Sequence, residues 1–263
     1  DFWDDYPSDL NLTIPPDTIK EYIGRIMTYG WQGNASTSWM TDDPEDASKM
    51  AGAIATQLLV WETVVGERES QFNQVDANAQ GKNNIAEYTS PENPLYSEIF
   101  SQYSAIESAV KRHTMLPSFF SSTADAGAYE LKWDGQQYSL TLTDTNGVLG
   151  DYTFTSNITG LNFSVDGNQL TITSSQAIKG SVTVKAEKIS AQRSGVVVWT
   201  DGIIGGGKQD FATYGETVSD YMVGYLNLEV KTGNMKLIKT SEDGQVAGIN
   251  FTITGEGYSA TMT

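Results

Sequence analysis

The sequence predicts an α+β fold, with helices in the first part of the chain and strands in the second. Up to about residue 113, apolar residues recur every three or four positions, which is the period of an amphipathic helix. After about residue 127, apolar and polar residues alternate between Asp-Gly turns, a pattern typical of antiparallel strands. We therefore expect a helical part over about 15–113 that packs on an antiparallel β-sandwich or barrel over about 127–230.

The composition narrows the classes of function. The chain has 263 residues, 39% of them hydrophobic, which is enough for a sizeable core. A net charge of -17 argues against a nucleic acid partner and suits a secreted or surface-displayed protein. The absence of cysteine excludes disulfides, thiolate zinc sites and cysteine nucleophiles within this sequence. With a single histidine and no apolar run of membrane length, we expect no cofactor and no membrane span.

Three helices are expected in the first part. The first begins after Pro15-Pro16, where Thr18 and Glu21 fit a capping box, and it ends before Gly30. The second runs over about 43–65, and the third follows Asn93-Pro94. The last turn of the third helix carries Lys111, Arg112 and His113, so we expect His113 to act as a capping side chain.

The expected strands lie between turn signals. Two hairpins are predicted, one across Asp134-Gly135 and one across residues 166–168. The predicted strands cover residues 129–133, 138–143, 161–165, 170–173, 181–187, 196–200 and 226–230. From residue 231 onward a second unit is expected, with strands over 235–240 and 247–253, as the first strands of an Ig-like β-sandwich. That unit has too little chain to close a core, so we expect the sequence to be a fragment of a longer polypeptide.

A candidate site lies near the end of the second helix. Gln57 and Trp61 are four residues apart and therefore lie one above the other on the helix surface. Apolar residues such as Ile54 and Leu58 extend a stripe beside them. A glutamine in such a stripe needs a polar partner, because a buried amide without one is costly. On residue types alone, Gln57 is expected to be a core glutamine bound to a backbone loop.

Several motifs together resemble the thioester domains of Gram-positive surface adhesins, often called TQxA domains. Thr56-Gln57 followed by Trp61-Glu62 is similar to the family's central helix motif, although Leu59 stands where that motif has alanine. The segment 29–34 resembles the turn ahead of that helix. Further resemblances cover Leu116–Phe119 with Leu140–Gly147, similar to the linker and first sheet of larger members, and Lys208–Phe211, similar to the C-terminal glutamine motif. The resemblance covers residues 1–230, which are expected to form one domain.

The resemblance implies covalent chemistry. In that family a cysteine thiol attacks a glutamine carboxamide, ammonia leaves, and the internal thioester then acylates an amine such as a host lysine. By motif order, Gln209 matches the acyl donor, while Gln57, with Thr56 and Trp61 of the central motif, is structural or the alternative donor. The alternative for Gln209 is an ordinary strand glutamine that faces solvent. Because the sequence has no cysteine, the thiol is expected upstream of Asp1, or this member lacks the bond.

The last unit, residues 231–263, resembles the start of a CnaB-type (SpaA-like) stalk domain, in which a lysine of the first strand forms an isopeptide bond. The motif alignment implies Lys239 for that role and leaves Lys236 outside. The alternative is a lysine that reaches to solvent from between apolar neighbours. A stalk implies an extracellular protein anchored to the cell wall.

The resulting expectation is an adhesin head that binds a host surface or matrix protein through its amines and is not a turnover enzyme. One alternative is a non-covalent carbohydrate- or protein-binding module on the same stalk. Another is a secreted hydrolase, which needs two carboxylates facing each other across a cleft. Acidic pairs such as Asp42-Asp43 and Glu67/Glu69 lack the spacing of such a dyad or of a calcium site, and are expected to be solvated loop carboxylates.

Overall fold

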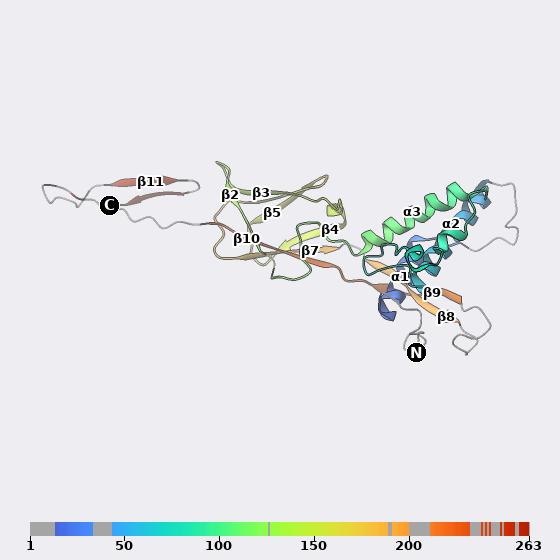
Figure 1. Ribbon diagram of the computed structural model, residues 1–263. Helices are drawn as coiled ribbons and strands as arrows, with labels where there is room; N and C mark the ends of the chain where they lie inside the picture. The colour runs from blue at the N-terminus through green and yellow to red at the C-terminus, as the bar shows by residue number, and fades with distance from the viewer. Residues whose placement is uncertain are drawn as a thin grey trace. The chain divides into compact units, whose positions relative to one another are not determined.

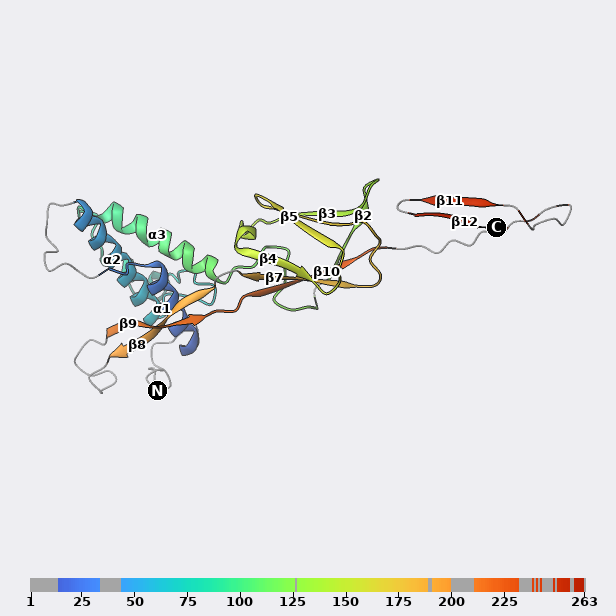
Figure 2. The same cartoon turned by 180° about the vertical axis from the view of Figure 1, so that it is seen from behind.

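The computed structural model describes residues 14–33, 44–125, 127–188, 191–199, 211–231, 250–255 and 258–262, together with residues 238, 240, 242 and 248. The fold class is α+β, as predicted, with helices first and strands after them (Figures 1 and 2). The chain divides into two compact units. The first consists of Asp1–Thr114 with Ala191–Asp220, and the second of Met115–Ser190 with Tyr221–Thr263.

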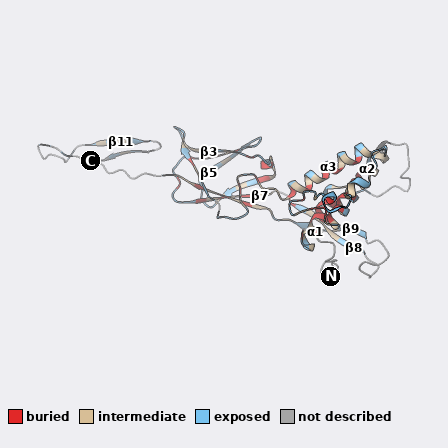
Figure 3. Cartoon of the chain, in the orientation of Figure 1, coloured by how far each residue is buried: buried red, intermediate tan, exposed pale blue. Residues whose placement is uncertain are grey.

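The first unit contains three α-helices and a β-hairpin. Its α-helices are α1 (Pro16–Tyr29), α2 (Pro44–Val64) and α3 (Tyr96–His113), and between the last two lie the short 3-10 helices η2 (Ala77–Gln80) and η3 (Ile85–Tyr88). The hairpin pairs β8 (Gln192–Trp199) antiparallel with β9 (Phe211–Ser219). Buried residues gather where the helices meet (Figure 3). This core contains the predicted apolar faces of α1 and α3, from Ile19 to Met27 and from Ile99 to Val110.

The start of α1 differs from the predicted capping box. Pro15 is the N-cap residue, and no side chain forms a cap hydrogen bond there. Pro16 follows as the first helical residue, a position that suits proline because its fixed φ is helical and its missing N–H would have no partner in the first turn. Glu21 instead forms an ion pair with Arg25, one turn further along the helix, at 3.2 Å.

The β8–β9 hairpin belongs with the helices rather than with the other strands. Val196 and Val198 of β8 pack against the helical core. The backbones of α1 and β8 approach closely, since a Cβ added at Gly24 would lie 2.3 Å from the carbonyl oxygen of Ser194. The sequence predicted a single β part over 127–230, but residues 191–220 belong to the first unit, with the helices. The strand β9 itself was not predicted.

The second unit contains two four-stranded sheets. One has the order β1 (Ala128–Glu130), β10 (Val223–Glu229), β7 (Val182–Lys188) and β4 (Tyr152–Ser156), and the other the order β2 (Lys132–Trp133), β3 (Tyr138–Thr143), β6 (Gln169–Ser174) and β5 (Leu161–Asp166). The short 3-10 helix η4 (Leu149–Asp151) precedes β4. Both predicted hairpin turns occur, with Gly135 and Gly167 at positive φ. The strand pairs described in these two sheets are antiparallel, as expected, except that β1 pairs with β10 in parallel.

Both sheets contribute to one core, as in a β-sandwich. Leu170 and Ile172 of β6, and Val184 and Leu226 of the other sheet, are fully buried in it. The predicted strand 129–133 is divided at Leu131, which is also buried and whose backbone N–H is donated to Glu229 O. The chain thus passes from one sheet to the other at Leu131.

Near the C-terminus, β11 (Phe251–Gly255) pairs antiparallel with β12 (Tyr258–Met262). The predicted strand 247–253 overlaps β11. Most of the predicted strand 235–240, with Lys236 and Lys239, lies outside the described residues. The domain boundary between 230 and 231 and the CnaB-type resemblance therefore stay predictions.

Candidate functional site

Thr56 of the central helix motif holds the turn that follows α1. Its hydroxyl donates to the carbonyl oxygen of Gly52 at 2.8 Å and accepts the backbone N–H of Trp31 at 2.9 Å. A Cβ added at Gly30 would lie 2.6 Å from Thr56 Oγ1 and 2.6 Å from Ile26 O, so only glycine fits between α1 and α2 here. The structure therefore brings together two of the motifs that the sequence singled out.

The same turn is bound from its other side by the hairpin. The carbonyl oxygen of Trp31 accepts the hydroxyl of Tyr214, on β9, at 2.7 Å. One peptide segment thus links α2, through Thr56, with β9, through Tyr214. Sequence reasoning did not find Tyr214, since β9 was not predicted and nothing local indicates its partner.

Gln57 does not have the buried environment that its place in an apolar stripe suggested. Its side chain is exposed, and Trp61 is 42% exposed, one turn further along α2. The face of α2 that packs into the core lies beside them and carries Leu58 and Leu59. The expectation of a core glutamine was wrong, because the buried stripe is shifted around the helix by one position. Leu59, which replaces the alanine of the family motif, is fully buried.

Gln209 and the rest of Lys208–Asp210 lie outside the described residues. The structure does describe the two ends of the surrounding segment, which are Trp199 at the end of β8 and Phe211 at the start of β9. These two residues are register partners in the hairpin. They are 62% and 64% exposed, respectively. A pair of exposed aromatic rings thus borders the segment with the predicted acyl donor.

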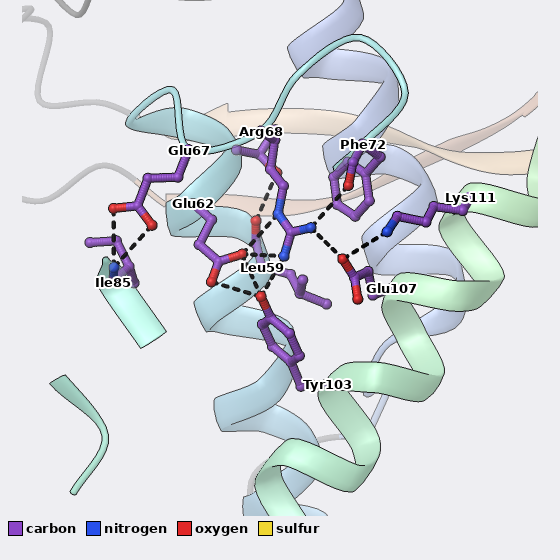
Figure 4. Close-up of polar contacts among 10 residues, drawn as sticks. Leu59, Glu62, Glu67, Arg68, Phe72, Ile85, Tyr103, Glu107 and Lys111 are labelled. Carbon is purple, nitrogen blue, oxygen red and sulfur yellow. Dashed lines mark hydrogen bonds and ion pairs between the residues drawn. The ribbon is translucent and has the colours of Figure 1, made fainter. Parts of the chain in front are cut away.

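Glu62, the acid of the Trp-Glu pair, is fully buried and binds a buried arginine (Figure 4). Arg68 donates from Nε to Glu62 Oε2 at 2.9 Å, and its Nη2 donates to the same oxygen. The hydroxyl of Tyr103, on α3, donates to both carboxylate oxygens at 2.9 and 2.8 Å. Burial and the neighbouring Glu62 charge raise the pKa of Tyr103, so its hydroxyl stays protonated and donates.

The network continues from Arg68 to α3. Arg68 Nη1 donates to Phe72 O at 2.9 Å and to Glu107 Oε1 at 2.6 Å, and Lys111 pairs with Glu107 at 3.1 Å. Burial alone would raise the pKa of Glu107, but hydrogen bonds from Arg68 and Lys111 outweigh it and hold that pKa below its usual range. The cluster therefore fixes α2 against α3. Its contacts with α3 were not predicted, because Tyr103 lies 41 residues from Glu62 and Glu107 lies 39 residues from Arg68.

Glu67 is likewise no solvated carboxylate. It is buried, and both of its oxygens accept the backbone N–H of Ile85 at 3.0 Å. Burial raises its pKa above the usual range. Glu69, by contrast, is half-buried and accepts a hydrogen bond from Asn73 at 2.6 Å. Within the described part of the chain, no group of three or more potential metal ligands is found.

His113 is buried rather than a capping side chain at the surface. It is 1% exposed, with Nδ1 2.7 Å from the hydroxyl oxygen of Tyr29 and Nε2 2.9 Å from Asp220 Oδ2. Asp220 also accepts from Arg193 Nε at 2.9 Å and from Arg25 Nε at 3.4 Å. Asp220 thus connects α1, α3 and β8 at the last residue of the first unit.

In the second unit, the two segments that resemble the linker and the first sheet of larger thioester domains bind each other. Asp144 is buried and accepts three backbone N–H groups: Oδ1 from Ser118 at 2.8 Å and Asn146 at 3.0 Å, and Oδ2 from Val148 at 2.7 Å. Asn146 Nδ2 also donates to Leu116 O at 2.8 Å. The arrangement has a structural role, since both carboxylate oxygens bind backbone donors.

Comparisons with known proteins give little beyond this. No family model matches the sequence, and no curated protein matches it. Among solved structures, the thioester domain of the Staphylococcus aureus TIE protein is similar over 82% of this chain and 70% of that chain, at 18% sequence identity and a TM-score of 0.37. A TM-score below 0.5 does not establish a common fold, and the α+β class of this chain rests on its own helices and sheets. No described helix has the length and apolar character needed to cross a membrane.

Proposed function

We propose that this chain is the head of an extracellular adhesin, anchored to a bacterial cell wall, that attaches covalently to amines of a host surface or matrix protein through an internal thioester. Gln209 is the proposed acyl donor, and the thiol comes from a cysteine outside this sequence. The head displays its bond for one attachment and is not a turnover enzyme. A CnaB-type stalk domain, with Lys239 as the isopeptide lysine, begins at residue 231.

The observation that carries the proposal is the double attachment of Trp31. Its N–H is bound by Thr56 of the central motif and its carbonyl by Tyr214, five residues after Gln209. The turn after α1 and the central helix motif, which the thioester resemblance singled out in separate parts of the sequence, are therefore in contact, and Tyr214 binds the same turn from β9. Acyl transfer within a protein requires such fixed placement, because the gain comes from holding the reacting groups in contact.

The test is an intact mass measurement on the protein extended upstream of Asp1 to include its cysteine, before and after treatment with methylamine. A thioester makes the protein one ammonia lighter than its sequence, and methylamine then adds to it. Gln209→Ala is expected to restore the full mass and abolish the reaction with methylamine, whereas Gln57→Ala retains both. Gln71→Ala, at another exposed glutamine of the same unit, is the matched control. A protein of full mass that ignores methylamine contradicts the proposal.

A non-covalent binding head is the second candidate, and the exposed pair of Trp199 and Phe211 favours it. The indole N–H of Trp199 is donated to Thr213 Oγ1 at 2.8 Å, which fixes the ring on the hairpin. Exposed, oriented aromatic rings are typical of binding surfaces. If this candidate is correct, Trp199→Ala abolishes binding in a glycan or matrix-protein array, whereas Gln209→Ala has no effect. Tyr88→Ala, which removes an exposed ring elsewhere in the unit, is the control.

A further inference from the structure

The strand β9 is exposed along almost its whole length. Every residue of β9 except Gly215 is exposed, whichever face of the hairpin it occupies. Its partner β8, by contrast, packs Val196 and Val198 against the helical core. β9 is therefore held mainly by its pairing with β8 and by the hydrogen bond from Tyr214 to Trp31.

One edge of β9 pairs with β8, and among the described residues no strand pairs with the other edge. No backbone group of β9 forms a backbone hydrogen bond with a described residue outside the hairpin. Such an edge presents a row of backbone N–H and C=O groups at the spacing of a strand. An extended polypeptide carries complementary groups at the same spacing, so the edge itself specifies the chemistry of its partner.

This edge has few of the features that protect exposed strands. Natural sheets usually prevent pairing with another chain by means of lysine, proline, a bulge or a very short edge strand. β9 has nine residues and contains neither lysine nor proline. Its ladder with β8 has one register shift, between Ser194 and Val196. The stretch Phe211–Tyr214 therefore remains a regular edge that is open to pairing.

The charge of the protein selects among the peptides that could pair with this edge. The chain has a net charge of -17, and Glu216 is the only charged residue of β9. Glu216 is exposed, and within the described part of the chain it forms no ion pair. A basic peptide is therefore attracted to this edge, whereas an acidic peptide or a second copy of this chain is repelled.

We propose that the free edge of β9 binds an extended, basic segment of a partner protein, which adds to the hairpin as a third strand. The hydrogen bonds to the backbone of β9 supply the affinity. The side chains of the added strand lie beside exposed apolar residues of β9, such as Phe211 and Val218, and beside Glu216. This binding goes beyond the proposed function, because it needs neither the thioester nor Gln209.

The first test uses the wild-type protein and a synthetic octapeptide in which lysine and valine alternate. The valines match the apolar side chains of β9, and the lysines match its negative charge. We expect binding in a calorimetric titration and slower hydrogen exchange at the amides of β9 when the peptide is bound. Absence of binding, or protection that omits β9, overturns the proposal.

Two N-methylated forms of this peptide separate backbone pairing from side-chain contact. One is methylated at the lysine amides and the other at the valine amides, so that each form has one edge without N–H donors. Because a strand pairs through one edge, we expect one form to bind about tenfold or more weakly and the other to bind like the parent. Equal binding of the two forms overturns strand addition. The protein is unchanged in this comparison, so no variant has to fold.

A further comparison tests the charge. Glu216→Lys is expected to weaken binding of the alternating peptide about threefold or more, whereas Glu92→Lys, at another exposed acid of the same unit, has little effect. An octapeptide with four lysines followed by four valines has the same composition without the alternation. If it binds as tightly as the alternating peptide, the attraction is charge alone and the proposal is overturned.

The outcomes separate this inference from the proposed function. A protein that has the thioester mass but does not bind the alternating peptide overturns strand addition alone. A protein that binds the peptide through β9 but lacks the thioester mass overturns the proposed function alone.

Discussion

Glu62 and Arg68 form an ion pair in which neither side chain has any exposure to solvent. The remaining polar atoms of the pair form hydrogen bonds with Tyr103, Phe72 and Glu107. Among the described residues, no buried side-chain nitrogen or oxygen lacks a hydrogen-bond partner. Such a pair adds little net stability compared with apolar residues, but the loss of one member leaves a buried charge without its partner. It therefore makes the placement of α2 against α3 sensitive to single substitutions.

Substitution of Arg68 tests this cluster. Arg68→Met leaves Glu62 as a buried carboxylate without its counter-ion, and we expect a loss of about 3–5 kcal/mol in the free energy of unfolding. Chemical denaturation followed by circular dichroism measures it. The exposed Lys82 gives the control Lys82→Met, which is expected to change the free energy by less than about 0.5 kcal/mol. The double variant Glu62→Leu/Arg68→Met should recover part of the loss, and an equal or larger loss would contradict the explanation by an unpaired charge.

The contact between Gly30 and Thr56 predicts the effect of a single methyl group. In Gly30→Ala, the new Cβ would lie 2.6 Å from both Thr56 Oγ1 and Ile26 O, so the backbone of the turn has to move. We expect a loss of about 1–3 kcal/mol in thermal or chemical unfolding, which is typical of overpacking. Gly150→Ala is the matched control, because nothing lies within 4 Å of its added Cβ. Equal stability of the two variants would show that the turn adapts freely.

The two hydrogen bonds of Trp31 should be coupled to each other. Thr56→Val and Tyr214→Phe each remove one of them, and each should lower the free energy of unfolding by about 1 kcal/mol. Because both bonds hold the same peptide segment, the effects of the double variant should not be additive. A double-mutant cycle by urea denaturation measures the coupling, with Thr56→Ser, which retains the hydroxyl, as the control. Strictly additive losses would mean that Thr56 and Tyr214 hold the turn independently.

Asp144 predicts how the second unit responds to acid. Burial alone would raise its pKa, but backbone N–H groups of Ser118, Val148 and Asn146 outweigh burial and hold the pKa below the usual range of an aspartate. A depressed pKa in the folded state contributes stability that is complete above the unfolded pKa and is lost as the pH falls through the folded pKa. Below about pH 4, the wild type should therefore lose this contribution.

The variant Asp144→Asn tests this assignment. It should cost about 1–3 kcal/mol at neutral pH, because one amide oxygen cannot replace two carboxylate oxygens, and the cost should shrink as the pH falls below about 4. Thermal unfolding between pH 3 and pH 7 gives the comparison. Asp166→Asn, at the exposed end of β5, serves as the control. If the cost of Asp144→Asn stays constant over this range, the buried carboxylate is not the group that titrates.

The candidate site could be predicted only in part. The motif at Thr56 and the glycine of the preceding turn were found because their residue types and order carry the signal. The partners of these residues were not found. Tyr214 lies 183 residues from Trp31 and Asp220 lies 107 residues from His113. Nothing near either residue in the sequence indicates which distant group it will contact.

The sequence by itself determined the local structure of this protein. The apolar period of α1 and α3 and the Asp-Gly turns between strands act over a few residues, so the α+β class and most elements could be predicted from them. The tertiary structure alone decided which elements belong together. It placed β8 and β9 with the helices, exposed Gln57, and buried Glu62, Arg68 and His113. The physical reason is that a charge or an amide can be buried only where distant parts of the chain supply its partners, and those contacts exist only after folding.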